Sequence, residues 1–161
     1  MDFTLQPATL NDKSLLRNLL ELCQHDYSEY NQSDINPHGL FTYAYLDHYW
    51  TEAGRYAFLV RVAENIAGFV LVRALGDEEK SLTYSMAEFF ILRKYRRRGL
   101  GRRVAQEIFK GFPGHWRVSQ EIDNCPAQAF WRNVIADYTG GNYKEVASTD
   151  DCPGPTQIFH N

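Results

Sequence analysis

Residues 86–109 read MAEFFILRKYRRRGLGRRVAQEIF, and this stretch decides the fold. It opens with an apolar run that is typical of a buried strand, and it closes with Leu100, Val104, Ile108 and Phe109 spaced along one helix face. Between the two lies the turn Arg96-Arg97-Arg98-Gly99-Leu100-Gly101. Glycines at such a turn let the backbone approach a ligand, and the first amides of a helix are unpaired donors. The stretch therefore predicts a strand, an anion-binding turn and a helix.

The flanking sequence adds further strands and helices on both sides of this stretch. We expect strands over 3–6, 56–63, 66–75, 82–92, 116–122, 143–147 and 156–159, and an acidic loop over 76–80. Helices are expected after a cap at Asn11 or Asp12, within 40–50, from Leu100 and from Ala127. The order β-α-α-β-β-β-α-β-α-β-β predicts an α/β fold with a mixed sheet, mostly antiparallel in its first half. No repeat or linker interrupts residues 1–161, so we predict a single domain.

The basic residues of the chain are unevenly distributed. The 161 residues carry 17 Lys+Arg and 20 Asp+Glu, a formal net charge of −3, and seven of the basic residues lie between Arg93 and Arg103. A compact cationic segment in an otherwise acidic chain predicts a local anion site, whereas a nucleic-acid binder usually spreads positive charge over a face. The charge pattern therefore argues against a nucleic-acid partner.

The cysteines and the apolar runs exclude other classes of protein. Cys23, Cys125 and Cys152 form no CxxC pair, so they predict neither a disulfide framework nor a metal site. The longest nearly apolar run, residues 66–72, is far shorter than the roughly 20 residues of a membrane-spanning helix. Because the N-terminus has no apolar signal segment, we expect a cytoplasmic protein with no membrane partner.

The pattern Arg96-x-x-Gly99-x-Gly101 resembles the [QR]-x-x-G-x-[GA] signature of the GNAT superfamily of N-acetyltransferases. Residues 90–96 look like the strand that leads into the superfamily's acetyl-CoA loop, and residues 124–131, NCPAQAFW, look like its later N-x-x-A-x-x-F-Y helix start. The third glycine of a dinucleotide fingerprint would fall at Val104, and no GK[ST] follows the turn, so neither a Rossmann nor a Walker-type loop is supported. The resemblance covers residues 56–140 well and the N-terminal third in outline.

The resemblance implies an acetyl-CoA-dependent N-acetyltransferase that uses no metal. The backbone amides from Arg97 to Arg102 would hold the coenzyme A pyrophosphate, and the backbone of Ile91 and Phe89 would pair with the pantetheine arm where this strand splays from the next. Asn124 would reach the pantetheine or the sulfur, cap its helix, or do both. The cofactor-binding residues that the resemblance implies are Phe89, Ile91, Arg96, Arg97, Arg98, Gly99, Leu100, Gly101, Arg102 and Asn124.

The chemistry of acetyl transfer points to two catalytic candidates. A neutral amine must attack the thioester carbon, so its proton needs a base, and Glu88 is the only carboxylate on the strand that carries Ile91. In a regular strand these two residues face opposite sides, and only a bulge between them would realign them. Trp131 stands where many relatives have an acidic Tyr, so Tyr138 is the candidate acid, with Tyr143 or an unassisted thiolate as alternatives.

In the resembled superfamily the N-terminal helices build most of the acceptor pocket. Here residues 1–52 hold eight acidic residues against Lys13 and Arg17, together with many tyrosines, which would suit a small cationic amine. The candidate pocket residues are Asp26, Tyr27, Tyr30, Asp34 and His38. Alternatively, the aromatic residues are core and the acidic residues are solvated surface. A catalytically silent acyl-CoA sensor is the alternative function, and many relatives form homodimers.

Overall fold

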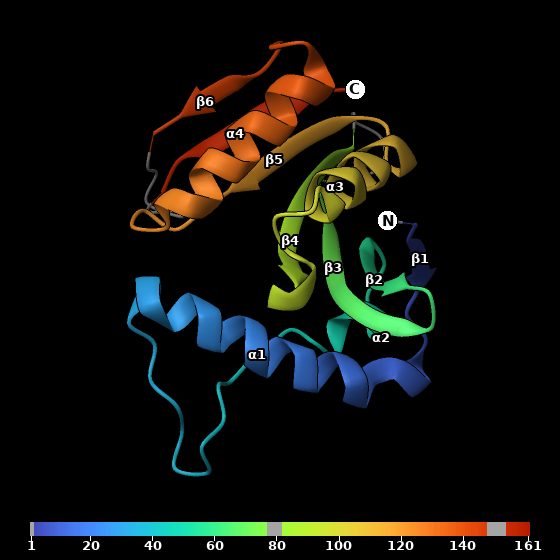
Figure 1. The fold of residues 1–161 in the computed structure, drawn as a ribbon, viewed down its shortest axis with the longest axis vertical. Helices are drawn as coiled ribbons and strands as arrows, with labels where there is room; N and C mark the ends of the chain where they lie inside the picture. Colours follow the sequence, from blue (N-terminus) through green and yellow to red (C-terminus); the bar gives the residue numbers. More distant parts are fainter. Residues whose placement is uncertain (1, 77–81, 148–153) are drawn as a thin grey trace.

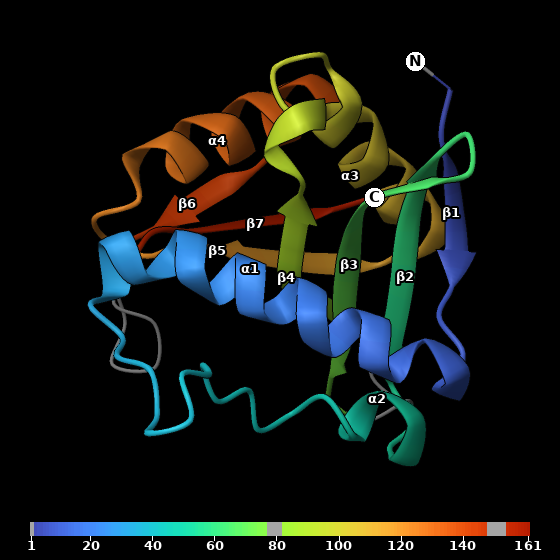
Figure 2. The same ribbon diagram turned by 60° about the horizontal axis from the view of Figure 1, so that its bottom comes forward.

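The computed structural model describes residues 2–76, 82–147 and 154–161, and these residues contain a seven-stranded sheet with helices on both faces (Figures 1 and 2). The strands are β1 (Thr4–Pro7), β2 (Arg55–Val62), β3 (Asn65–Leu75), β4 (Thr83–Ile91), β5 (His115–Ser119), β6 (Lys144–Val146) and β7 (Thr156–His160). The helices are α1 (Lys13–Asn31), α2 (His48–Thr51), α3 (Leu100–Gly111) and α4 (Cys125–Thr139), with short 3-10 turns at Leu10–Asp12 and Arg93–Tyr95. The predicted element order is confirmed.

The strand order in the sheet is β1-β2-β3-β4-β5-β7-β6. The pair β4 and β5 is parallel, and the other neighbouring pairs are antiparallel. The first four strands therefore form the antiparallel half that the sequence predicts. The parallel pair needs a crossover, and α3 supplies it.

Some predicted boundaries shift by a few residues. The turn between β2 and β3 lies at Ala63 and Glu64, one residue earlier than expected, and Ala63 takes a left-handed φ of 50°. The strand β5 ends at Ser119 instead of residue 122. At the start of α1, the Asp12 carboxylate accepts from the backbone amide and the hydroxyl of Thr9, both at 2.8 Å, so it closes the preceding turn. Within the acidic loop expected at 76–80, residues 77–80 lie outside the described residues.

Two apolar clusters hold the layers together, one on each face of the sheet. The helices α3 and α4 cover one face, and Leu100, Val104, Ile108 and Phe109 are buried there, as the helical spacing predicts. The helix α1 covers the other face, where Leu16, Leu19, Leu20 and Cys23 pack on Leu59, Phe69, Leu71 and Phe90. Burying each large apolar side chain contributes about 1.5–3 kcal/mol, so both faces hold their helices firmly.

The sheet opens between β4 and β5. The two strands pair only from Thr83 to Ser85 and from His115 to Arg117. Beyond these residues β4 continues beside β3 as far as Ile91, while β5 continues beside β7 and ends. The result is a gap at the C-terminal ends of two parallel strands, as the resemblance implies.

A β-bulge in β4 changes the face that Glu88 presents. In the register with β3, Leu71 pairs with Glu88 and Val72 pairs with Met86, so Ala87 is the extra residue. Met86 packs with the α3 and α4 cluster, and strict alternation would put Glu88 on that same face. The bulge reverses the alternation, so that Glu88 lies on the face covered by α1, as Phe90 does. This bulge lies before Glu88 and not between Glu88 and Ile91, so these two residues remain on opposite faces, as in a regular strand.

Candidate active site

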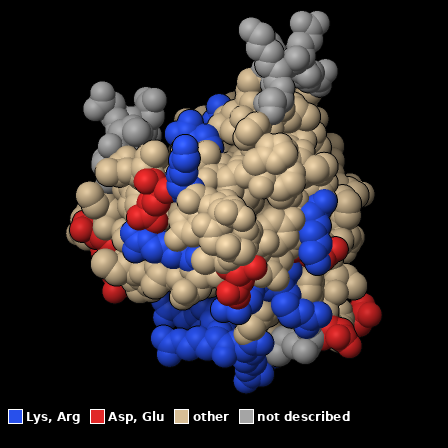
Figure 3. Space-filling model, turned by 90° about the horizontal axis from the view of Figure 1, so that it is seen from above, with Lys and Arg blue, Asp and Glu red and all other residues tan. Residues whose placement is uncertain are grey.

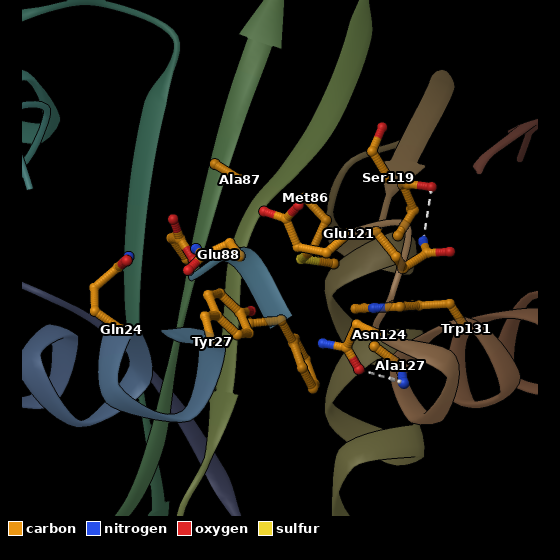
Figure 4. A pocket seen from close by; sticks show the side chains of 14 residues that line it. Gln24, Tyr27, Met86, Ala87, Glu88, Ser119, Glu121, Asn124, Ala127 and Trp131 are labelled. Carbon is orange, nitrogen blue, oxygen red and sulfur yellow. Dashed lines mark hydrogen bonds between the residues drawn. The ribbon is translucent and has the colours of Figure 1, made fainter. Parts of the chain in front are cut away.

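A cavity of about 410 Å³ lies where β4 and β5 separate (Figure 4). Four segments line it: α1, the bulged part of β4, the end of β5 with the turn that follows, and the start of α4. The lining residues are Gln24, Tyr27, Asn31, Met86, Ala87, Glu88, Phe89, Val118, Ser119, Gln120, Glu121, Asn124, Ala127 and Trp131. The cavity therefore joins residues that are up to about a hundred positions apart in the chain.

Glu88 has the environment of a general base. Burial raises its pKa to about 7, the nearby Glu121 carboxylate contributes to that rise, and hydrogen bonding from the Tyr43 hydroxyl partly opposes both effects. The Cys23 thiol also points at the carboxylate, with Sγ 4.0 Å from Oε2. A base with a pKa near neutrality is half deprotonated at working pH and can both take and release a proton.

The α1 wall of the cavity supplies neutral polar groups around this carboxylate. Burial raises the pKa of the Tyr27 phenol well above its usual value, and the neighbouring Cys23 and Glu88 add to that rise. Burial and Glu88 likewise raise the pKa of the Cys23 thiol. Both groups therefore stay protonated at neutral pH, and of these three side chains Glu88 is the one that can carry a charge there.

Asn124 and Trp131 form the opposite wall. Asn124 is 6% exposed, and its Oδ1 accepts from the backbone amide of Ala127 at 3.0 Å, so the predicted helix cap is confirmed. Figure 4 shows the Nδ2 of the same side chain on the side that faces the cavity. The Trp131 ring packs edge-on against Phe89, with centroids 5.0 Å apart. A capped helix start and an aromatic pair thus fix this wall.

The glycine-containing turn leads from β4 into α3. Arg97 and Gly99 take left-handed φ angles of 60° and 76°, and α3 begins at Leu100. Such a conformation costs a residue other than glycine about 1–2 kcal/mol, which explains Gly99. At Gly101 an added Cβ would lie 3.3 Å from the Phe130 ring and 3.8 Å from Phe89. Gly101 therefore allows α3 to pack closely on α4 and β4, which sets the position of the first α3 amides.

Arg96 ties this turn to β4 and to α1. Its Nε donates to the Ile91 carbonyl at 2.6 Å, and its guanidinium pairs with Asp26 at 2.5 Å. Arg93 pairs with the second oxygen of Asp26 at 2.6 Å. Burial alone would raise the pKa of Asp26, but the hydrogen bonds from Arg96 and Arg93 lower it below its usual value. The Arg96 guanidinium thus bonds to the Ile91 carbonyl and to the Asp26 carboxylate, and a role of Arg96 in binding the cofactor stays a prediction.

The comparisons with known proteins agree with this geometry. The model of the acetyltransferase (GNAT) family matches residues 16–134. The chain belongs to this family. No curated protein sequence matches the chain.

The similar solved structures are acetyltransferases with low sequence identity. An acetyltransferase from Thermus thermophilus has a TM-score of 0.72 at 18% identity, over 100% of this GNAT chain and 98% of the other. The PaiA N-acetyltransferase from Thermoplasma acidophilum, in complex with coenzyme A, has a TM-score of 0.63 at 9% identity, over 100% of both chains. An aminoglycoside acetyltransferase from an uncultured soil metagenomic sample, in complex with trehalose, has a TM-score of 0.58 at 17% identity, over 82% and 86%. At these identities the likeness shows the GNAT fold.

The structure separates the residues predicted for the acceptor pocket of this GNAT protein. Tyr27 lines the cavity. Asp26 is not among the residues that line this cavity, and its carboxylate pairs with Arg93 and Arg96. Tyr30 is half-buried on α1 outside the cavity lining, and Asp34 and His38 are exposed in the segment that follows α1. Of the three candidates on α1 only Tyr27 lines the cavity, and Asp34 and His38 lie beyond the end of this helix at Asn31.

Tyr138 also lies away from the cavity. Its hydroxyl accepts from Nδ2 of Asn161 at 3.1 Å, and its ring packs on Phe109. Seven residues separate it from Trp131, which keeps the same helix face but moves it about 10 Å along the axis. Tyr138 therefore does not reach the reacting groups, and we do not retain it as the acid.

The remaining predicted cofactor residues have distinct surroundings. Leu100 is buried with its side chain in the core, and Arg97 and Arg98 are exposed. Arg102 pairs with Asp137 at 2.5 Å. A dense group of Lys and Arg side chains lies at the lower edge of Figure 3, in keeping with the basic segment from Arg93 to Arg103.

One cavity residue, Glu121, was missed by the sequence analysis. Its position shortly before the N-x-x-A helix start could have drawn attention to it, since that start lines the donor site in the resembled superfamily. The structure places its carboxylate across the cavity from α1.

No helix within the described ranges is long and apolar enough to cross a membrane.

Proposed function

We propose that this chain transfers the acetyl group of acetyl-CoA to the primary amine of a small cationic molecule by direct attack on the thioester. The observation that carries the proposal is the cavity at the opening of the sheet, with Glu88 on one wall and Asn124 on the other. Membership of the GNAT acetyltransferase family supports the acetyl transfer. The similar PaiA structure holds coenzyme A, which supports a coenzyme A thioester as the donor.

The residues present fit such a donor. Within residues 2–76, 82–147 and 154–161, the backbone of β4 after Ser85 has no strand partner on its β5 side. Unpaired backbone groups need partners, which the amides of an extended pantetheine arm would supply. The Ile91 carbonyl already accepts from Arg96, so this pairing falls mainly to Phe89 and its neighbours. The first amides of α3, from Leu100 to Arg102, and those of the preceding turn would hold the pyrophosphate.

Proton transfer follows from the position of Glu88. The amine enters as an ammonium, and the Glu88 carboxylate takes one proton so that the nitrogen lone pair can attack the thioester carbon. The C–N bond forms, the carbonyl electrons move to oxygen, and their return breaks the C–S bond. The nitrogen loses a second proton, and the coenzyme A thiolate takes up one. The net reaction releases one proton, and Glu88 passes it to solvent.

In this mechanism water donates the proton that the coenzyme A thiolate takes up. Tyr27 is the one phenol among the described residues that line the cavity, but burial raises its pKa, which makes it a weak acid. A coenzyme A thiolate is a tolerable leaving group, because its thiol pKa is comparable to the roughly 8.5 of cysteine. Deprotonated Glu88 as the base, with a thiolate that leaves without a protein acid, is therefore sufficient for acetyl transfer.

Release of free thiol in a screen of amines with acetyl-CoA tests the proposal. We expect at least one small primary amine to give thiol at a rate proportional to enzyme concentration, with the acetylated amine detected by mass spectrometry. Saturable acetyl-CoA binding without turnover of any amine would instead favour the acyl-CoA sensor. A single domain over 1–161, a homodimer and a cytoplasmic location stay predictions from the sequence.

A further inference from the structure

Among the residues that the structure describes, two carboxylates and no basic side chain line the cavity. Its 14 lining residues include Glu88 and Glu121, and none of them is Lys, Arg or His. Within the described residues, neither carboxylate takes part in an ion pair. The cavity is therefore negatively charged, and its charge is not neutralised by the described parts of the chain.

Hydrogen bonds to its backbone carbonyl hold Glu121 in place, and within the described residues its carboxylate has no ion-pair partner. Its carbonyl accepts from the Asn124 amide at 3.1 Å and from Nε2 of Gln128 at 3.0 Å, so the turn after β5 is fixed. The side chain is half-buried and lines the cavity opposite α1. Figure 4 shows Glu88 and Glu121 on strands or turns from the two separated halves of the sheet. The two groups thus approach one space from opposite sides.

The buried polar surroundings of the pair also point to a ligand. Asn124 is 6% exposed, and its Nδ2 faces the cavity while its Oδ1 is bound to Ala127. Gln120, also 6% exposed, lines the cavity with both of its amide atoms bonded to Gln157. These amides are rigid, since each has a fixed partner. The carboxylates therefore stand in a preorganised space and not on a mobile surface.

An acceptor that is held by charge during the reaction needs a second cationic group besides the nitrogen that reacts. The nitrogen that attacks must be neutral at the moment of attack, so its attraction to Glu88 as an ammonium is lost when the proton moves. A carboxylate that holds the acceptor through the transition state must therefore pair with another cationic group. Glu121 is the one remaining carboxylate among the lining residues.

Resting on the proposed function, we propose that the acceptor is a linear molecule with two amino groups, a diamine or polyamine. One nitrogen reacts beside Glu88, and the second, still an ammonium, pairs with Glu121. An amino acid fits this cavity less well, because its carboxylate would meet Glu121 and find no cationic side chain among the lining residues. A slender acceptor also suits a cavity of about 410 Å³ that must admit the acetyl end of the donor.

A matched series of three amines tests the second contact. The probes are 1,4-diaminobutane, 1-aminopentane as its uncharged-end isostere, and 5-aminopentanoate with a carboxylate at the far end. We expect kcat/KM from thiol release to favour the diamine over the monoamine by about ten- to a hundredfold, the range of a charge-assisted hydrogen bond. The aminopentanoate should be the poorest of the three.

Substitutions at Glu121 test whether this residue causes the preference for the diamine over the monoamine. Glu121→Gln keeps the shape and should bring the diamine to monoamine ratio close to one, mainly through the KM of the diamine. Glu121→Lys should make 5-aminopentanoate better than the diamine. Asp123→Asn, on the same turn, exposed and outside the cavity lining, is the matched control and should keep the wild-type ratio. Far-ultraviolet circular dichroism and acetyl-CoA binding check that each variant is folded.

The outcomes separate the two proposals. A monoamine that reacts as well as the diamine, or a ratio that survives Glu121→Gln, overturns the assignment of Glu121 while leaving the acetyltransferase proposal standing. No thiol release with any amine, despite acetyl-CoA binding, removes both proposals. A preference for the diamine that Glu121→Gln abolishes and Asp123→Asn retains supports the assignment.

Discussion

The donor side of the proposed active site is one contiguous stretch, residues 89–102, whereas its acceptor side is assembled from α1, the bulge of β4 and the turn after β5. The donor side acts through backbone groups whose positions depend on two glycines. The acceptor side acts through carboxylates, and the charge of Glu88 depends on its burial and on the nearby Glu121. A change of side-chain chemistry should therefore damage the acceptor side most, and a change of backbone shape should damage the donor side most.

The largest expected effect on activity comes from Glu88. Glu88→Gln removes the base and keeps the size of the side chain, so kcat/KM for any amine acceptor should fall by about 10²- to 10⁴-fold. In the wild type, log kcat/KM should rise with pH and level off above about 7, the pKa of Glu88. The variant should lose that step, and a steady-state pH profile of both proteins measures it. Retention of the step in the variant would assign the base to another group.

Glu88 should increase activity but lower the free energy of unfolding at high pH. Burial raises the pKa of Glu88 above its value in the unfolded chain, so the folded state binds more protons between about pH 4.5 and 7, and the free energy of unfolding falls as pH rises through that window. Glu88→Gln should therefore be more stable than the wild type at pH 8, by about 1–3 kcal/mol, and about equally stable at pH 4. Urea denaturation at the two pH values measures the difference. Equal stability at pH 8 would mean that the carboxylate is better solvated than its surroundings indicate.

The next largest effect is expected from the donor side. Gly99→Val forces a β-branched residue into a left-handed φ of 76°, and Gly101→Val adds methyl groups where even a Cβ lies 3.3 Å from Phe130. Each should weaken acetyl-CoA binding by at least about tenfold, since strain of about 1–3 kcal/mol displaces the first α3 amides. Isothermal titration calorimetry measures the affinity. Gly111→Ala, at the far end of α3 with open space around it, is the control. Unchanged affinity in both valine variants would remove the turn from the donor site.

The sequence predicts the donor side well because its signals are local. A strand, a turn with positive φ and an amphipathic helix follow one another within 24 residues, and each depends on neighbours in the chain. The acceptor side depends on contacts between residues that are far apart in the sequence, and no local sequence pattern indicates such contacts. The bulge at Ala87 is set by the register with β3, and Asp26 meets Arg96 across 70 positions. Glu121 and Tyr43 come near Glu88 only when the sheet opens and the segment before α2 packs.

A smaller effect tests the contact that joins the two sides. Asp26→Asn breaks the ion pairs with Arg96 and Arg93, which hold α1 against the end of β4. Because Arg93 is largely exposed and water screens its charge, we expect a loss of about 1 kcal/mol in the free energy of unfolding at pH 7. The pKa of Asp26 is lowered in the fold, so this stabilisation is present above about pH 4 and declines as pH falls below it. Urea denaturation at pH 7 and pH 3 measures the trend.

Asp137→Asn is the matched control for that contact. It removes the pair with Arg102, in which both side chains are about half exposed, so its loss should stay below about 0.5 kcal/mol. Asp26→Asn should also raise the KM for acetyl-CoA several-fold, because Arg96 would hold the Ile91 carbonyl less firmly. If the two variants lose the same small stability and keep the same KM, α1 and the donor turn are energetically independent.

The smallest effect on activity is expected at Tyr138, which the sequence suggests as the acid and which the structure places half-buried against the core and away from the cavity. Tyr138→Phe removes a hydroxyl that accepts from Asn161, whose Nδ2 also donates to the Phe109 carbonyl at 2.6 Å. The free energy of unfolding should fall by about 0.5–1 kcal/mol, while kcat stays within about twofold of the wild type. Tyr27→Phe, which removes the phenol that does line the cavity, is the partner variant and should lower kcat/KM more than Tyr138→Phe does. A tenfold loss of kcat in Tyr138→Phe with the fold intact would restore its role as the acid. That result would also require α4 to shift by about two turns in the donor complex, since about 10 Å separate this position from Trp131 along the helix.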